Sequence, residues 1–262
     1  MKLALVQMNI AADLETNLRH AHELCLRAKG ADVIMLPEMF CCPYQNREFV
    51  KNAQPEGGSI TAALASIAQE TGAYLIGGSM PERDGEKLYN TCFVFDPAGR
   101  RIARHRKAHL FDVSIDGGQK YKESRTFSAG EELCVFDTPF GRFGVIVCFD
   151  IRFPRFISAM GDIDFLAVPA AFNMTTGPLH WELLFRARAV DEQLYTFGCA
   201  PARDENARYV SYANSIAVDP WGRIVARAGT EETVLTVDVD PGEVRAVRRQ
   251  IPIGKQPREN DN

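Results

Sequence analysis

The strongest constraint on the fold is a series of short apolar runs, rich in β-branched residues, that recurs along the 262-residue chain. Each run has roughly four to eight residues and is bounded by Gly, Pro or Asp, which is typical of buried β-strands. The runs are residues 3–8, 32–37, 73–79, 91–96, 143–149, 164–170, 195–200, 215–219 and 233–239. Because helical patterns lie between some of these runs, the chain is predicted to adopt an α/β fold.

Two segments between the runs have helical periodicity. After Asp13, a good N-cap residue, Leu18 and Cys25 fall on one helical face and Gly30 marks the stop, so Cys25 is predicted to be a core residue. A second helix is predicted to open at Pro178, because Pro is favoured in the first turn. The apolar stripe of this second helix comprises Trp181, Leu184, Phe185 and Ala189.

Two pairs of segments resemble each other within the chain. Residues 31–37 resemble residues 163–169, and residues 96–100 resemble residues 219–223. A degenerate duplication of two halves would produce such pairs, but hairpin turns also resemble one another by chance. Both interpretations stay open at this point.

Nothing in the composition divides the chain into several domains. Hydrophobic residues make up 46% and charged residues 24%, as in globular proteins with a large core. No Pro/Ser/Gly-rich linker interrupts the chain. We therefore predict one domain over residues 1–253, made of two packed sheets covered by helices, and a polar tail over residues 254–262.

Charge and hydropathy argue against two classes of partner. Lys and Arg number 30 against 34 Asp and Glu, a net charge of −4, so the basic footprint of a nucleic-acid-binding protein is missing. No run approaches the roughly 18 to 20 apolar residues that span a bilayer, and the first residues lack the pattern of a signal peptide. We expect a cytosolic protein with neither a nucleic-acid nor a membrane partner.

Motifs for metals and cofactors are also missing from the sequence. The seven cysteines include no C-x-x-C pair, which disfavours a structural zinc site, and most should be small buried side chains. His105 and His109 share the i, i+4 spacing of a metal pair but lack the Glu of H-E-x-x-H. Neither phosphate-binding glycine motif nor a G-x-S-x-G elbow occurs. We expect no metal and no cofactor.

Three reactive side chains stand where the predicted strands end or the chain turns. Glu38 follows residues 32–37 directly, and loops beyond strand ends build the sites of α/β sheets. Lys107 lies in a basic cluster, which by default is an exposed surface. Cys148 precedes a polar turn, where unpaired N–H groups and nearby cations would lower the pKa of its thiol. Taken singly, these positions are by default a solvated Glu, an exposed Lys and an inert buried Cys.

In combination, these segments resemble a known signature. LPEMF around Glu38, HRKAHLF around Lys107 and VCFDIRFP around Cys148 resemble the Glu–Lys–Cys set of the nitrilase superfamily, the carbon–nitrogen hydrolases. Glu123 in YKES matches the additional glutamate of that family. The later segments look most like the ω-amidase branch, whose members hydrolyse the terminal amide of α-keto-acid amides. Those segments are AFNMTTGPLHWELLFRARAVDEQLY, PARD, DPWGRIVARAGTEE and RRQIP.

The resemblance implies an αββα sandwich that usually dimerises, and a role for each matched residue. Cys148 would be the nucleophile, Glu38 the general base and acid, and Lys107 the stabiliser of the oxyanion. The backbone N–H of Phe149 would complete the oxyanion site, and Glu123 would orient Lys107 and the substrate amide. Such a set suits an amide, because a thiolate must attack while a proton reaches the departing nitrogen.

The resemblance also implies how substrate is recognised. Arg152 would pair with a substrate carboxylate, which a guanidinium can hold through two hydrogen bonds. Tyr44, Phe172 and Thr176 match positions that line the pocket and bind the acid end. On residue type alone, Tyr44 would be a surface aromatic and Phe172 a core side chain.

The sequence departs from the family pattern in three places. Phe149 stands where Tyr is common, Arg155 stands where Glu usually follows Phe-Pro, and the helix after Cys148, over residues 155–164, is short. These positions lie near the entrance or a dimer-forming helix, so they bear on substrate length and assembly.

The sequence thus predicts a cofactor-free cytosolic amidase, ω-amidase-like, acting on a small dicarboxylic acid monoamide such as 2-oxoglutaramate. A homodimer or higher homo-oligomer is expected. The alternatives are an N-carbamoyl amino acid amidohydrolase, a nitrile-hydrolysing enzyme, and a catalytically inactive binding or assembly protein that keeps the sandwich. The adjacent Cys41 and Cys42 also leave a thiol redox sensor open.

Overall fold

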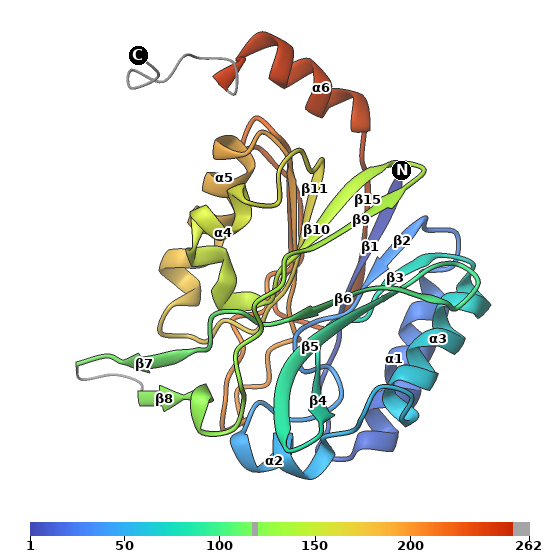
Figure 1. Cartoon of the computed structure of the whole chain (residues 1–262), viewed down its shortest axis with the longest axis vertical. Coiled ribbons are helices and arrows are strands. Elements are labelled where there is room, and N and C mark those ends of the chain that lie inside the picture. The colour runs from blue at the N-terminus through green and yellow to red at the C-terminus, as the bar shows by residue number, and fades with distance from the viewer. Residues whose placement is uncertain (117–119, 254–262) are drawn as a thin grey trace.

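Two β-sheets pack face to face, and helices cover both outer faces (Figure 1). The computed structural model describes residues 1–116 and 120–253, so the predicted tail, residues 254–262, lies outside the described residues. On one side the covering helices are α1 (Leu14–Arg27) and α3 (Ser59–Thr71), and on the other α4 (Pro154–Ser158) and α5 (Gly177–Asp191). This is the αββα sandwich that the resemblance predicted.

The first sheet has a parallel centre of β1, β2 and β3. In sheet order its strands are β15 (Thr233–Asp238), β1 (Lys2–Gln7), β2 (Val33–Met35), β3 (Tyr74–Ile76), β5 (Lys87–Phe95) and β4 (Met80–Asp84), with β6 (Arg101–Arg106) also paired to β5. The short helix α2 (Asn46–Asn52) precedes α3.

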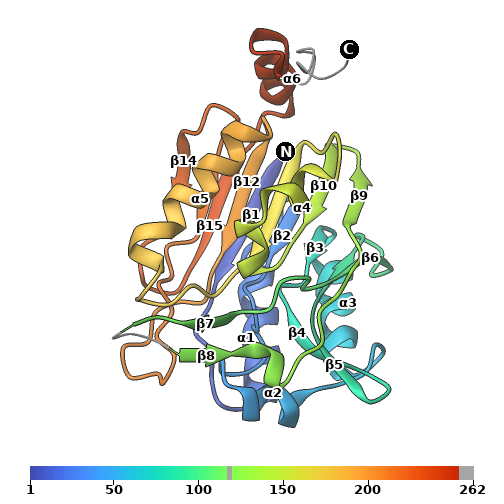
Figure 2. The same cartoon turned by 60° about the vertical axis from the view of Figure 1, so that its left-hand side comes forward.

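The second sheet repeats this plan with a parallel centre of β10, β11 and β12. In sheet order its strands are β14 (Ile224–Arg227), β13 (Ile216–Val218), β12 (Tyr195–Cys199), β11 (Phe165–Pro169), β10 (Gly141–Val145) and β9 (Cys134–Thr138). A separate pair, β7 (Asp112–Ser114) and β8 (Lys120–Lys122), lies at one end of the sandwich in Figure 2. The last helix, α6 (Pro241–Gln250), follows β15.

The predicted strands are confirmed, because every apolar run contains residues of a strand. Strands β4, β7, β8, β9 and β14 were not predicted. Each of them is an edge strand of its sheet, and each carries exposed polar residues, so its sequence lacks a continuous apolar run.

The two predicted helices are confirmed with small differences at their ends. Asp13 caps α1 by accepting a hydrogen bond from the backbone N–H of Thr16 at 2.8 Å, and Cys25 is fully buried, as predicted. The helix ends at Arg27, before Gly30. Helix α5 begins one residue before Pro178. The helix after the Cys148 turn, α4, covers only Pro154–Ser158 and is shorter than the predicted segment.

The segments that resemble each other take equivalent places in the two sheets. Residues 31–37 contain β2 and residues 163–169 contain β11, and each strand is the middle one of a parallel trio. The two hairpin turns are also alike. In each turn the Asp carboxylate, of Asp96 or of Asp219, accepts hydrogen bonds from the backbone N–H groups of the residues two and four positions after it. The two halves thus share a plan, and a duplication stays a prediction.

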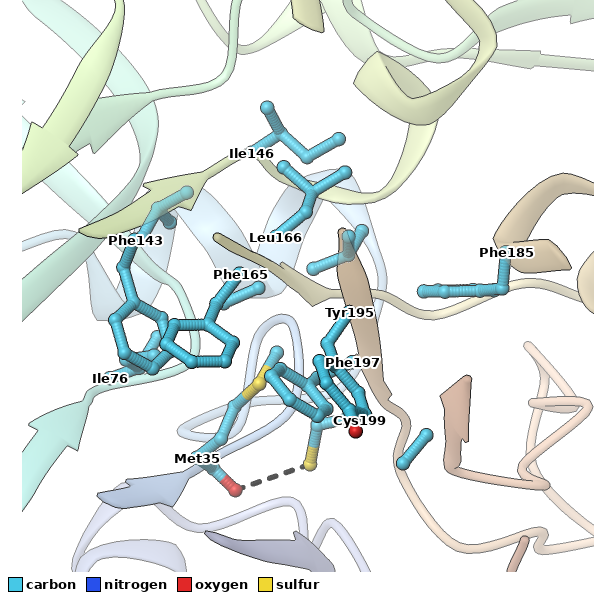
Figure 3. Packing of buried hydrophobic residues seen from close by; sticks show 14 of the residues in the cluster. Met35, Ile76, Phe143, Ile146, Phe165, Leu166, Phe185, Tyr195, Phe197 and Cys199 are labelled. Atoms are coloured by element: carbon cyan, nitrogen blue, oxygen red, sulfur yellow. Dashed lines mark hydrogen bonds between the residues drawn. The ribbon is translucent and has the colours of Figure 1, made fainter. Parts of the chain in front are cut away.

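The core lies between the two sheets. Figure 3 shows Met35 and Ile76 of the first sheet close to Phe143, Phe165 and Phe197 of the second, all with no exposed surface. Burying each such side chain stabilises the fold by roughly 1.5–3 kcal/mol. All seven cysteines are free and buried, as predicted for most of them. In residues 1–116 and 120–253, no helix has the length and apolar character needed to cross a membrane.

Candidate active site

Four reactive side chains from distant segments are buried at one end of the sandwich. Glu38 follows β2, Lys107 follows β6, Glu123 opens a short 3-10 helix (Glu123–Arg125), and Cys148 opens another (Cys148–Arg152) after β10. Glu38, Lys107 and Glu123 have no exposed surface, and Cys148 is 6% exposed. The solvated Glu and the exposed Lys that residue type alone would suggest are therefore wrong.

The Lys107 ammonium group bridges the two glutamates. Its Nζ atom lies 2.9 Å from Glu38 Oε1 and 2.9 Å from Glu123 Oε2. Burial alone would lower the pKa of Lys107, but the charges of Glu123 and Glu38 together raise it well above its ordinary value. Lys107 therefore stays a cation at every physiological pH.

Asn90 and Tyr44 also join the two carboxylates. The Asn90 side-chain amide donates to Glu38 Oε1 at 2.9 Å and to Glu123 Oε1 at 3.1 Å. The Tyr44 hydroxyl lies 3.4 Å from Glu38 Oε1 and 3.3 Å from Glu123 Oε1. Sequence reasoning missed Asn90, although a buried polar residue inside the apolar strand β5 is a detectable signal. Tyr44 is buried, so the surface alternative for it is wrong.

Backbone N–H groups also donate hydrogen bonds to the two carboxylates. Ala171, just after β11, donates its N–H to Glu38 Oε2 at 2.9 Å, and Phe111 donates its N–H to Glu123 Oε2 at 2.6 Å. The first of these bonds joins the two sheets, because Glu38 follows β2 and Ala171 follows β11. Both carboxylates are thereby held in fixed orientations, as a proton-transfer group requires.

Cys148 occupies a strained turn. Its φ of +48° lies in the left-handed region, which costs a residue with a side chain about 1–3 kcal/mol. The next residue, Phe149, is the second in the 3-10 helix, where a backbone N–H has no partner inside the helix. The turn thus presents both the sulfur and the Phe149 N–H, the group predicted to bind an oxyanion.

The predicted direction of the Cys148 pKa shift is wrong. Burial and the charge of Glu38 raise the pKa of the thiol well above its ordinary value, and the opposing effects of Lys107 and the Ala171 N–H are smaller. The sulfur therefore rests as a neutral thiol. A base must take its proton before it can attack, and the Glu38 carboxylate that contacts it is placed to do so.

A small cavity lies beside Cys148. Three of the residues predicted to recognise substrate line it together with Cys148, namely Arg152, Phe172 and Thr176. Tyr44 lines an adjoining cavity instead, with Glu38. The polar loop after β12 contributes Tyr209, which borders both cavities and stacks on Tyr44 at 4.6 Å between ring centroids. Sequence reasoning missed Tyr209, and nothing in its loop sequence signals it.

Arg152 is a cation without an anionic partner. Its guanidinium lies over the rings of Phe149 and Phe172, at 5.5 and 5.2 Å from their centroids, and Nη2 lies 3.2 Å from His180 Nδ1. Across the part of the chain that the structure describes, no carboxylate lies within ion-pair distance of it. Burial lowers the pKa of Arg152, so a carboxylate entering the cavity would relieve an uncompensated charge.

The two histidines that share the spacing of a metal-binding pair bond to a carboxylate instead. His105 and His109 both bond to Asp150. Among the described residues, no three His, Cys, Asp or Glu side chains gather closely enough to hold a metal ion.

A family model described as carbon-nitrogen hydrolase matches residues 2–249. The chain belongs to the carbon-nitrogen hydrolase family. As a carbon-nitrogen hydrolase it is an enzyme that cleaves carbon–nitrogen bonds with water, which confirms the predicted family and enzyme class.

Relatives of this carbon-nitrogen hydrolase align over nearly their whole length. The omega-amidase NIT2-A of Xenopus laevis is 48% identical over 261 residues, which cover 98% of this chain and 95% of that protein. The omega-amidase NIT2 of Homo sapiens is 44% identical over the same shares. The crystal structure of Saccharomyces cerevisiae Nit3, a member of branch 10 of the nitrilase superfamily, matches with a TM-score of 0.89 at 38% identity, covering 98% of this chain and 96% of that one.

Proposed function

We propose that this carbon-nitrogen hydrolase is an ω-amidase that releases ammonia from a small dicarboxylic acid monoamide such as 2-oxoglutaramate. The observation that carries the proposal is the guanidinium of Arg152, which has no carboxylate partner among the described residues and lines the same cavity as the Cys148 thiol. A substrate held there by its carboxylate presents its far end to the sulfur. Relatives named omega-amidase at 44–48% identity support the same substrate class.

The first half of the reaction forms a thioester. Glu38 takes the proton of the Cys148 thiol, and the sulfur attacks the amide carbon to form a tetrahedral intermediate. Lys107 and the Phe149 N–H stabilise its oxyanion, and one such donor contributes roughly 3–4 kcal/mol. Glu38 then gives the proton to the nitrogen, the carbon–nitrogen bond breaks, and ammonia leaves.

The second half hydrolyses the thioester. Glu38 accepts a proton from a water molecule, the water oxygen attacks the thioester carbon, and the same oxyanion site stabilises the second intermediate. The carbon–sulfur bond then breaks and Cys148 recovers its proton from Glu38. Glu123, through its ion pair with Lys107, keeps that ammonium group facing the reacting carbon.

The shape and charge around the cavity support a small anionic substrate. The cavity that Cys148 and Arg152 line is small, which favours a small substrate. A neighbouring groove, bordered by Tyr44 and Tyr209, has a basic lining without a carboxylate, which raises the local concentration of anions. Its basic residues are Arg47, Lys120, Lys122, Arg125 and Arg208.

We also propose that the chain forms one domain over residues 1–253 and assembles as a homodimer. The shared core of both sheets supports the single domain. Helix α5 supports the dimer, because it exposes 73% of Leu179 and 62% of Leu183 beside the half-exposed Val190. A reducing cytosol is the compartment that suits seven free cysteines.

A panel of amides tests the function. The purified protein should release ammonia without carbon dioxide from 2-oxoglutaramate, and much more slowly from a neutral amide of equal length. Release of carbon dioxide with ammonia from N-carbamoyl amino acids would instead show an N-carbamoyl amidohydrolase. Cys148→Ala should abolish turnover, whereas Cys25→Ala, a change at another buried thiol remote from the site, should keep it. Equal rates for wild type and Cys148→Ala would refute the cysteine mechanism.

A further inference from the structure

Asp150 is a fully buried carboxylate that the reaction steps above do not use. It lies two residues after Cys148, in the same 3-10 helix. Its Oδ2 atom accepts hydrogen bonds from the ring of His105 at 2.9 Å and from the backbone N–H of Val147 at 3.1 Å. Its Oδ1 atom accepts from both the backbone N–H and the ring Nδ1 of His109, each at 2.8 Å. Four donors therefore converge on one side chain.

These donors belong to the two segments that carry the proposed oxyanion site. His105 and His109 stand two residues before and two residues after Lys107, and Val147 immediately precedes Cys148. The Asp150 carboxylate thus joins the Lys107 segment to the nucleophile turn. Among the described residues, no other hydrogen bond joins residues 105–109 to residues 147–152.

In the described structure, the backbone hydrogen bonds of Lys107 itself go to residues outside the Cys148 turn. Its N–H donates to the Asn90 carbonyl at 2.8 Å, and its carbonyl accepts from Gly130 at 2.9 Å. Asn90 lies in β5 of the first sheet, whereas Cys148 follows β10 of the second sheet. Glu38 also relates the Lys107 side chain to the second sheet, through its bonds to Lys107 and to the Ala171 N–H, but Asp150 is the side chain that joins the Lys107 segment to the backbone of the Cys148 turn.

The charge of Asp150 strengthens this connection. Burial alone would raise its pKa, but the hydrogen bonds from His105 and His109 hold the pKa well below its usual value. The group therefore stays ionised, and hydrogen bonds to an ionised acceptor are about twice as strong as neutral ones. The His109 ring also stacks on Phe153 at 3.5 Å between centroids, which fixes the ring that donates.

We propose that Asp150 is a positioning residue that sets the distance between Lys107 and the Cys148 turn. The proposal rests on the roles given above to Lys107 and Cys148. An oxyanion must lie about 3 Å from both the Lys107 ammonium group and the Phe149 N–H at once. A misplacement of about 1 Å in such a site can cost about 100-fold in rate, so one connection between the two donors has a measurable effect.

Asp150→Asn tests the proposal without changing side-chain size. The variant removes the charge and turns an amide N–H toward the surrounding donors. We expect kcat to fall by about 30- to 100-fold and KM to stay within about threefold, because substrate contacts are unchanged. Thermal unfolding and circular dichroism check that the variant is folded.

A double-mutant cycle separates positioning from a general structural role. In a Lys107→Met background, Asp150→Asn should lower kcat by less than about threefold, since the donor that it positions is already gone. Losses that multiply in the double variant would overturn the proposal, because independent effects are additive in free energy.

A milder variant covers the case in which Asp150→Asn does not fold. His109→Phe keeps the ring that stacks on Phe153 and removes only the Nδ1 hydrogen bond, so kcat should fall by about 3- to 10-fold. His22→Phe is the matched control, because the His22 ring also bonds a carboxylate, that of Glu70 at 3.0 Å, on the exposed face of α1. It should leave kcat unchanged.

The outcomes distinguish this inference from the proposed function. If wild type turns over amides and Lys107→Met is impaired, but His109→Phe and Asp150→Asn both match wild type, the positioning role is wrong and the function stands. If wild type hydrolyses no amide, or Lys107→Met is as active as wild type, the proposed function fails and the positioning role fails with it.

Discussion

The Nζ atom of Lys107 lies 2.9 Å from an oxygen of Glu38 and 2.9 Å from an oxygen of Glu123, and all three side chains are fully buried. A single cation therefore stabilises two carboxylates that have no exposed surface. Removing one partner from a buried ionic group leaves uncompensated charge, which is more costly than the loss of a surface ion pair.

Lys107→Met should consequently reduce both stability and turnover. We expect the free energy of unfolding, measured in urea, to fall by about 3–5 kcal/mol, because two buried carboxylates lose their cation. We expect kcat to fall by about 10²- to 10³-fold through loss of an oxyanion donor. Lys51→Met is the control, since Lys51 is an exposed lysine 3.8 Å from Glu48 and should change neither quantity. A Lys107→Met variant as stable as wild type would contradict this account of the site.

The rate at which Cys148 is alkylated should rise only at high pH. Burial and Glu38 raise the pKa of the thiol, so its alkylation by chloroacetamide should still be increasing above pH 9, whereas a free thiol has a pKa of about 8.5. Glu38→Gln removes a negative charge that disfavours the thiolate. The rise in alkylation rate should therefore move to lower pH in this variant, although its amidase turnover is lost. Mass spectrometry of Cys148→Ala gives the background, and a plateau below pH 8 in wild type would show that the thiolate is the resting form.

Arg152→Met should separate substrate recognition from catalysis. Loss of a charged hydrogen-bonding partner costs roughly 2–5 kcal/mol, so KM for an acidic monoamide should rise at least tenfold. The kcat/KM for a neutral amide should change little. Arg155→Met, an exposed arginine three residues further on, provides the control. Equal effects of Arg152→Met on acidic and neutral amides would move carboxylate recognition to another residue.

Leu183→Glu should prevent dimer formation if α5 is the interface. Leu183 is 62% exposed on an apolar face, and a carboxylate placed there would be desolvated on association. Sedimentation velocity should give a dimer for wild type and a monomer for the variant. Val50→Glu introduces the same charge at a residue 51% exposed on α2 and should leave the dimer intact. A wild-type monomer at micromolar concentration would end the dimer proposal.

The strands and the reactive residues of this chain could be predicted because their signals are local. A run such as residues 164–170 is apolar enough to be a buried strand whatever surrounds it, and β11 lies inside it. Glu38, Lys107 and Cys148 each stand in a short motif whose order along the chain is informative. The edge strands β4 and β9 were missed because exposure on one side removes the apolar run on which the prediction depends.

The pKa of Cys148 shows why local information is insufficient. The sequence around it contains a polar turn and cations, which predict a lowered pKa, but the dominant effects are burial and the charge of Glu38. Glu38 is 110 residues away in sequence and approaches the sulfur only when the two sheets pack together. A pKa depends on desolvation and on charges in space, neither of which has a local sequence signature.

The amino-acid sequence by itself determined the α/β class, the family and the identity of the reactive side chains, because side-chain chemistry and apolar periodicity are properties of consecutive residues. The tertiary structure alone decided that Asn90 bridges two carboxylates, that Tyr209 borders the cavity and that Asp150 joins the Lys107 segment to the Cys148 turn. Each of these relationships is a contact between segments far apart in the chain, and such contacts form only when the packing of the two sheets sets the distance between them.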